Sequence, residues 1–272
     1  MTIASEITDL QTNLAAAKTA VENKGGTIGD TGLAGLASEI ATIPTGATGS
    51  WGTITYLDSN DQERTVTIQN EDEYFLLSHF GTWDVTIGGE TFNTSRITSV
   101  ALGTYATYAD AYFLYNCTLL TTITGVENLI FVNVSFLSGC ENLNCALNFE
   151  RLYSMGANFM SGCKAFNTQI LLPEAHTIGQ RFMSGCIAFA QPFTFNSNIT
   201  SGSSYIMSDC THLTSLVINC NPTALTESVY SFSTTDVNAP AYTTGVTISG
   251  TYASDFKTRF PNRDTSPYRK LI

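Results

Sequence analysis

The residues of this chain best placed to carry chemistry are cysteines, and five of them recur at a nearly constant spacing. Successive members of the set stand 23, 23, 23 and 24 residues apart. They are Cys117, Cys140, Cys163, Cys186 and Cys210. A cysteine nucleophile needs a neighbouring base, and a zinc site needs further ligands at short spacing, but neither a recurrent base nor a Cys-x-x-Cys pair is present. The repetition therefore favours a column of small buried hydrophobic side chains over disulfides or metal ligands.

Other groups that could act in catalysis are far apart in the sequence. His79, His176 and His212 occupy unrelated positions, without a metal-spaced partner or a Gly-x-Ser-x-Gly motif nearby. The chain contains no Walker loop and no dinucleotide-binding motif. We therefore predict that it is not an enzyme and that it holds no cofactor and no metal.

Each recurrent cysteine ends a short phrase that repeats through the middle of the chain. In the second repeat this phrase is Phe136-Leu-Ser-Gly-Cys140, and a large apolar residue follows three positions later. An apolar run such as Leu147–Phe149 comes next and is short enough for one strand per repeat. A fixed period of this length is typical of a solenoid, in which stacked units bury an apolar edge against their neighbours. We predict a mainly β solenoid of about five to six 23-residue coils over residues 99–236.

Two positions depart from the period. Fifteen residues after the cysteine, the apolar position occupied by Val132 and Met155 becomes Ser201 in the fourth coil. Ser233 stands 23 residues after Cys210, in the place of the cysteine. We expect a local irregularity in the fourth coil and a weaker sixth coil at the end of the array.

The first 46 residues are predicted to be helical. Apolar residues recur there at alternating steps of four and three, which are the a and d positions of a heptad. They are Ile3, Ile7, Leu10, Leu14, Ala17 and Val21. Three heptads are too few to be stable alone, so this stripe needs a partner. Both an intramolecular helical hairpin and a small trimeric or docking bundle would supply one, and we expect residues 1–46 to anchor or oligomerise the chain.

Smaller regions are expected on both sides of the solenoid. Residues 47–98 are predicted to form a small α+β module that caps the first coil, with a helix over 71–80 that carries Phe80 inward. Residues 237–272 are predicted to form a C-terminal cap with a basic tail, and contact of this tail with an acidic neighbour is the alternative. Caps are needed because an open repeat end exposes apolar surface.

The charge balance limits the possible partners. The chain has 23 acidic and 12 basic residues, which give a net charge of −11. This charge disfavours non-specific binding to nucleic acid and to anionic membranes. No window reaches the roughly 18 apolar residues that would cross a bilayer, and the N-terminus lacks the basic region of a secretory signal. We expect a soluble chain that is made in the cytoplasm.

The repeated phrase resembles the BspA-like leucine-rich repeats, a family of 23-residue units with a recurrent core of phenylalanine, cysteine and leucine. The resemblance covers about residues 95 to 235, with Phe166 and Phe189 in place of leucine. It implies a leucine-rich-repeat-type solenoid.

The flanks carry a second resemblance. The segments 18–26, 33–43 and 266–272 are similar to parts of structural proteins of phages and prophages of gut bacteria. Such proteins are commonly tail-fibre, receptor-binding or head-decorating components. This resemblance implies a virion protein that is made in the host cytoplasm and released with particles. Its N-terminal helices would bind other virion proteins, and a homotrimer is the favoured assembly.

Two functional hypotheses follow. In the first, the solenoid projects from a phage virion and binds a host-surface glycan or protein through a broad face. Tyrosines are the candidates for this contact, and packing in the core is the alternative role for each. They are Tyr105, Tyr108, Tyr112, Tyr115, Tyr153 and Tyr205. In the second, the chain is a bacterial BspA-like adhesin or host-interaction protein, and an internal baseplate scaffold is a further possibility.

Overall fold

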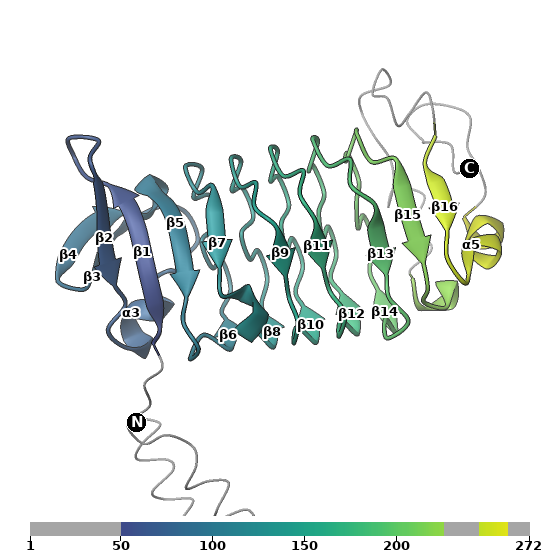
Figure 1. Ribbon diagram of the computed structural model, residues 1–272, viewed down its shortest axis with the longest axis horizontal. Helices are drawn as coiled ribbons and strands as arrows, with labels where there is room; N and C mark the ends of the chain where they lie inside the picture. Colours follow the sequence, from purple (N-terminus) through teal and green to yellow (C-terminus); the bar gives the residue numbers. More distant parts are fainter. Residues whose placement is uncertain (1–49, 226–244, 261–272) are drawn as a thin grey trace, which may run out of the picture. The chain divides into compact units, whose positions relative to one another are not determined.

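Stacked coils form the body of this protein, as seen in a computed structural model that describes residues 50–225 and 245–260 (Figure 1). The chain divides after residue 49 into two units, and all of the described residues belong to the second. The predicted fold class, a mainly β solenoid with short helices, is confirmed. The predicted helical segment 1–46, with its apolar stripe, lies outside the described residues.

An antiparallel hairpin begins the described chain and joins the coils through a shared sheet. β1 (Gly52–Leu57) pairs with β2 (Glu63–Thr67) on one side and with β5 (Ile97–Leu102) on the other. β5 in turn pairs in parallel with β7 (Thr122–Thr124), a strand of the first coil. The backbone ladder and the hydrophobic core therefore continue from this region into the repeats.

A short helix and a second hairpin lie between β2 and β5. α3 (Glu71–Phe75) begins after Asn70, whose side chain accepts a hydrogen bond from a backbone N–H of the first turn, as an N-cap does. β3 (Asp84–Ile87) pairs with β4 (Glu90–Asn93).

The helix predicted over residues 71–80 is shorter than expected. It ends at Phe75, and three residues later Ser78 forms a β-bridge with Phe113 of the first coil. The backbone that would have continued the helix pairs with the repeats instead. The prediction that Phe80 points inward is wrong, because its side chain is 66% exposed.

Each coil contributes two short strands, whereas the sequence predicted one. The first strands after β7 are β9 (Leu147–Asn148), β11 (Ile170–Leu171), β13 (Phe193–Phe195) and β15 (Ser215–Ile218). The second strands are β6 (Tyr108–Ala109), β8 (Phe131–Val132), β10 (Ser154–Met155), β12 (Thr177–Ile178) and β14 (Ser201–Gly202). The second strands form one continuous parallel sheet. All five are two residues long, and so short a strand shows no alternation of its own in the sequence.

The third side of each coil is a corner formed by the repeated phrase. In every repeat, two positions of this corner have left-handed backbone with φ between 55° and 79°, and in the first two coils Leu114 and Leu137 are left-handed as well, at 53° and 56°. The first position, just before the phrase, is filled by Tyr112, Ser135, Asn158, Arg181 and Tyr205. The second position, just before the cysteine, is filled by Asn116, Gly139, Gly162, Gly185 and Asp209. These bends direct backbone N–H groups toward the neighbouring coil, and the N–H of Gly162 donates to the carbonyl oxygen of Ser184 at 2.7 Å.

The recurrent cysteines form a column inside this corner. All five have 0% exposure, and all seven cysteines of the chain are free thiols. From the second coil onward, each Sγ–H donates to a main-chain carbonyl oxygen 26 or 27 residues earlier, at 2.9 to 3.2 Å. Cysteine fits this position because it is small and apolar and still has a weak donor.

Burial also sets the protonation of these thiols. It raises the pKa of Cys117 to about 12, and it raises the pKa values of Cys140 and Cys186 well above their ordinary range. The thiolate is the reactive form of cysteine. At neutral pH the column is therefore protonated and packed, and it offers no nucleophile.

Aromatic rings stack beside the cysteines. Phe113, Phe136, Phe159 and Phe182 begin the phrase in four successive coils. Their ring centroids are separated by 5.7, 5.2 and 5.1 Å, and each pair is stacked. All four are fully buried, so each coil needs the next one to cover its ring.

The fourth coil contains one extra residue, as the departure at Ser201 predicted. Buried Leu172 and Ala175 are three positions apart in the third coil, whereas the equivalent Phe195 and Ile199 are four apart. The extra residue lies in the turn 196–198. β14 is consequently offset by 24 residues from β12, and Gly202 takes the inward position.

The array closes with a strand and a helix. β16 (Thr247–Ser249) pairs in parallel with β15, and α5 (Ala253–Arg259) follows it with Phe256 buried. The expected sixth-coil position at Ser233 lies outside the described residues, as does most of the basic tail. Within the described ranges, no helix has the length and apolar character needed to cross a membrane.

We predict that the left-handed corner makes Gly162 sensitive to alanine. A Cβ there would have space, since its nearest neighbour is Gly139 Cα at 3.8 Å, but φ of +79° strains any ordinary side chain. Gly162→Ala should lower the free energy of unfolding by about 1–2 kcal/mol. Gly162→Asn should cost less although asparagine is larger, because Asn116 already holds the equivalent position in the first coil. Urea unfolding of both variants tests this, and an asparagine variant no more stable than the alanine variant would contradict it.

We also predict a thiol contribution to alkaline unfolding. Below about pH 9 the Cys117 thiol is protonated in both states, so its full contribution to stability is present. As the pH rises from 9 toward 12 the unfolded chain releases this proton first, and the free energy of unfolding falls by about 1.4 kcal/mol per pH unit. The free energy of unfolding, measured at several pH values, should therefore decrease less steeply with rising pH for Cys117→Ala than for the wild type. Equal slopes would show that the thiol titrates normally in the folded state.

Candidate binding surface

Four aromatic side chains lie in a row on the side formed by the second strands. Tyr108 and Phe131 are register partners on β6 and β8. On the next coil Ser154 is in register with Phe131, so Tyr153 lies one residue before that position, and His176 follows Tyr153 by 23 residues. The ring centroids of Phe131 and Tyr153 are 6.1 Å apart, and the stacked rings of Tyr153 and His176 are 4.2 Å apart. We call these four residues the aromatic row.

The local strand geometry explains why the row faces solvent. Successive residues of a strand point to opposite sides, so the burial of Val132 in the core turns Phe131 outward. Tyr108, Phe131 and Tyr153 are 38%, 46% and 46% exposed. Contiguous exposed apolar surface of this kind is a mark of an interaction site, whereas a single exposed ring would need no explanation.

Polar groups hold the first ring of the row in place. The Tyr108 hydroxyl donates to Asp110 Oδ1 at 3.2 Å. The Asn133 amide donates to the same Tyr108 oxygen at 3.2 Å and to Asp110 Oδ1 at 3.3 Å. These bonds link adjacent coils and leave lone pairs of the carboxylate available at the surface.

A shallow groove lies beside the middle of the row. It is lined by Ile130, Phe131, Glu150, Arg151, Tyr153 and Glu174. The three charged side chains of the groove make no ion pair with other described residues. The groove thus combines two exposed rings with two carboxylates and one guanidinium.

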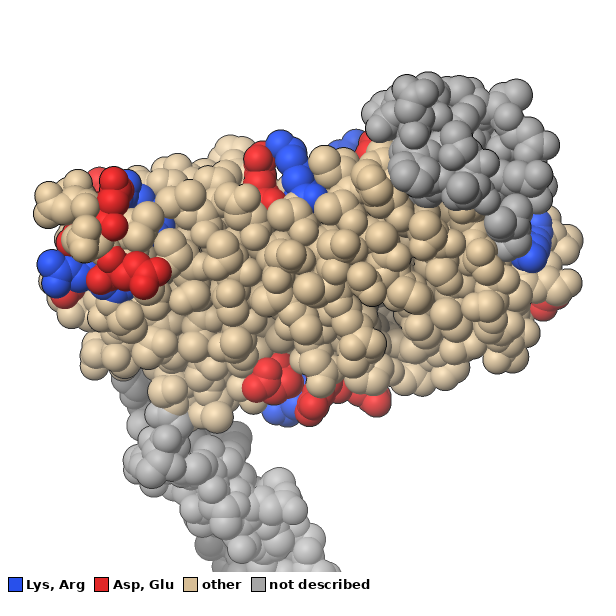
Figure 2. All heavy atoms as spheres, turned by 45° about the horizontal axis from the view of Figure 1, so that its top comes forward, with Lys and Arg blue, Asp and Glu red and all other residues tan. Residues whose placement is uncertain are grey.

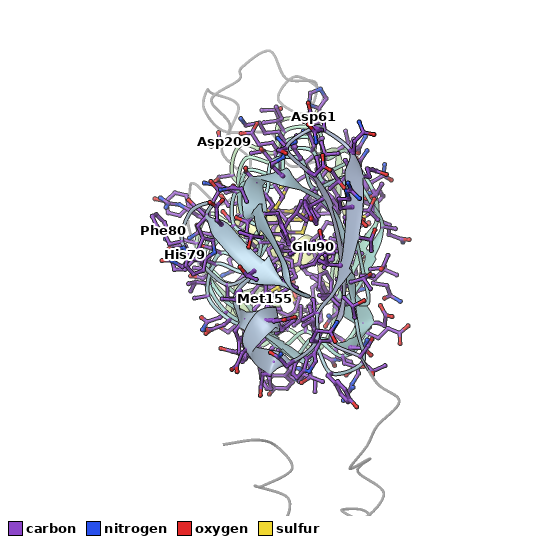
Figure 3. All side chains as sticks on the ribbon, turned by 90° about the vertical axis from the view of Figure 1, so that its left-hand side faces the viewer. Asp61, His79, Phe80, Glu90, Met155 and Asp209 are labelled. Atoms are coloured by element: carbon purple, nitrogen blue, oxygen red, sulfur yellow. The ribbon has the colours of Figure 1, made fainter. Side chains whose placement is uncertain are left out.

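The structure separates the six predicted tyrosines. Tyr108 and Tyr153 belong to the aromatic row. Tyr112 and Tyr115 lie at the corner, where their rings are 5.1 and 5.2 Å from that of Phe80. Figure 3, which views the molecule from the N-terminal end of the stack, shows Phe80 with His79 at the outer rim.

The last two predicted tyrosines are partly covered by neighbours. The ring of Tyr105 is 5.6 Å from that of Trp51. Tyr205 lies under the guanidinium of Arg181, whose carbon is 5.6 Å from the ring centroid. Neither reaches the aromatic row.

Two members of the row were not among the predicted residues. Phe131 follows Tyr108 by 23 positions, and His176 follows Tyr153 by 23 positions. The repeat period applied to each tyrosine would therefore have found them.

The opposite side of the coils, formed by the first strands, has a different character. Its outward residues carry no charge, and they include Thr124, Asn148, Leu171, Thr194 and Val217. Figure 2 shows this surface as a broad area without lysine, arginine, aspartate or glutamate, with charged groups along its edges. We call it the neutral face.

Candidate metal ligands do not gather in the part of the chain that the structure describes. No set of three or more histidine, cysteine, aspartate or glutamate side chains there could hold a metal ion.

Comparison with known proteins identifies a family and a related solved structure. The profile described as "BspA type Leucine rich repeat region" matches residues 84–167 and 147–255, in six copies. The crystal structure of a leucine-rich repeat protein from Bacteroides ovatus ATCC 8483 matches with 15% identity and a TM-score of 0.36. This match covers 74% of the present chain and 54% of that protein, so the chain spans about half of its length.

The comparison with curated proteins gives no match. The predicted resemblance to phage structural proteins finds no support in the family match or in the Bacteroides structure.

Proposed function

Because the chain belongs to the BspA-type leucine-rich repeat family, we propose that it is a non-catalytic binding protein that attaches to a partner surface through the aromatic row. The observation that carries this proposal is the alignment of exposed rings on successive coils. Aromatic side chains contribute large contact areas at a low entropic cost, and they are enriched where binding energy concentrates.

The neutral face is the alternative contact surface. It is broad and uncharged, but the outward residues named above are mostly threonine and asparagine, and Leu171 is the one large hydrophobic side chain among them that is exposed. The aromatic row offers more apolar area per residue together with charged groups beside it. We therefore assign binding to the row and use the neutral face as the control.

We propose that residues 1–46 anchor the chain, so that the repeats are displayed to their partner. Their heptad stripe fits an anchor or a small homo-oligomer, with a trimer favoured. Family membership supports display as an adhesin, in which the segment would engage a bacterial surface component. A virion location, with the segment bound to other particle proteins, rests on the sequence of the flanks alone.

We predict that binding depends on the aromatic row. The labelled full-length protein is mixed with intact bacterial cells and with intact epithelial cells, and bound protein is measured by flow cytometry. The triple variant Tyr108→Ser, Phe131→Ser, Tyr153→Ser should lose about tenfold or more in affinity, since truncation of a central aromatic residue commonly costs over 1 kcal/mol. A neutral-face variant, Thr124→Ser with Thr194→Ser, should bind like the wild type.

Both variants should unfold at nearly the wild-type temperature, because the changed side chains are exposed. Absence of wild-type binding to every cell type, or full binding by the aromatic variant, would overturn the proposal.

We predict that removal of residues 1–46 changes assembly without unfolding the repeats. The chain divides into two compact units, with the repeat core in the unit Ser50–Ile272, so this core should persist in the shortened chain. Sedimentation should show an oligomer for the full chain and a monomer for residues 47–272. Circular dichroism should show the same strand signal for both. Loss of that signal on truncation would mean that the segment belongs to the fold of the repeats.

A further inference from the structure

We infer that the ligand of the aromatic row is a neutral carbohydrate chain, an inference that rests on the proposed binding function of the same surface. The row and its groove place exposed rings, carboxylates and an amide on neighbouring coils. This combination matches the two kinds of surface that a sugar ring presents, which are its C–H faces and its hydroxyl edge.

The aromatic rings would contact the C–H faces of the sugar. The face of an aromatic ring carries partial negative charge, and it attracts the weakly positive C–H groups of a sugar. Tyr108, Phe131 and Tyr153 belong to three successive coils, so the rings recur along the stack. A ligand built from repeated rings can engage them one after another, which a single small molecule cannot do.

The polar side chains would form hydrogen bonds with the hydroxyl edge of the sugar. Sugar hydroxyls both donate and accept hydrogen bonds, so they need carboxylate acceptors together with donors. Glu150 and Glu174 supply acceptors in the groove, and Arg151 supplies donors. Asp110 supplies a further carboxylate acceptor beside Tyr108.

The charges of the surface restrict the class of carbohydrate. Three carboxylates and one guanidinium lie along the row and its groove. Their net negative charge repels sulfated or sialylated chains and nucleic acids. Neutral sugars are not repelled.

A protein ligand is the competing class. Protein contacts of high affinity centre on apolar pockets that are fully desolvated. The groove is lined by two rings and three charged side chains, and Ile130 is the single aliphatic residue in its lining. Desolvating these charges against an apolar partner would cost free energy. The composition of the groove therefore favours hydroxyl partners.

The direct test uses immobilised oligosaccharides, with neutral hexose chains on one set of spots and sialylated or sulfated chains on another. The full-length protein should bind neutral chains, and Phe131→Ser with Tyr153→Ser should weaken that binding about tenfold or more. Glu150→Gln with Glu174→Gln should also weaken it about tenfold, because hydrogen bonds to charged acceptors are the strong ones. The matched control is Glu141→Gln, since Glu141 is an exposed carboxylate that pairs with Lys164 instead of lining the groove.

Preference for anionic chains, or no loss of binding in the Glu150/Glu174 variant, would overturn the inference. A second arm treats the cells of the binding assay with periodate, which destroys sugar diols, or with protease. Binding lost after periodate and retained after protease supports a carbohydrate. Binding that requires the aromatic row but is lost only after protease overturns the carbohydrate inference and leaves the proposed function standing. Binding that does not require the row overturns both.

Discussion

The corner of each coil is the constraint on which the rest of the structure depends. Two left-handed residues bend the chain there, and the bend places a cysteine where its thiol can reach a carbonyl oxygen of the previous coil. The same bend aligns the phenylalanine rings into a stack. A coil with a different corner would lose the backbone bond, the thiol bond and the ring contact together, so the repeated phrase tolerates little change.

The aromatic row is a consequence of this alignment. Since each corner returns the chain to the same register, residues 23 positions apart lie beside each other on the outside as well as in the core. Tyr108 and Phe131 are neighbours for the same reason that Cys140 and Cys163 are. The solenoid thus converts a periodic sequence into a continuous strip of chemistry, with the core residues of the period invariant in kind and the outer ones free to specialise.

The sequence was sufficient to predict the class of fold because the period is visible without any knowledge of contacts. It did not reveal the second strand of each coil, since a strand as short as Phe131–Val132 leaves no alternating pattern. It also placed Phe80 wrongly, because the end of α3 is decided by pairing between Ser78 and Phe113, which are far apart in the chain. The choice of tyrosines identified Tyr108 and Tyr153 of the aromatic row. Phe131 and His176 are found only when the 23-residue period is applied to those two tyrosines.

The extra residue in the turn 196–198 shows how the two sheets depend on the length of the chain. The second strands of the third and fourth coils are 24 residues apart, whereas Phe193 and Leu216 on the first strands remain 23 apart. The segment that leads to Leu216 is therefore one residue shorter, which compensates for the residue added in the turn. A change of length in one turn therefore need not displace the ladder on the other side. In evolutionary terms, such turns are where related arrays can gain or lose residues, and where new loops can arise beside an unchanged core.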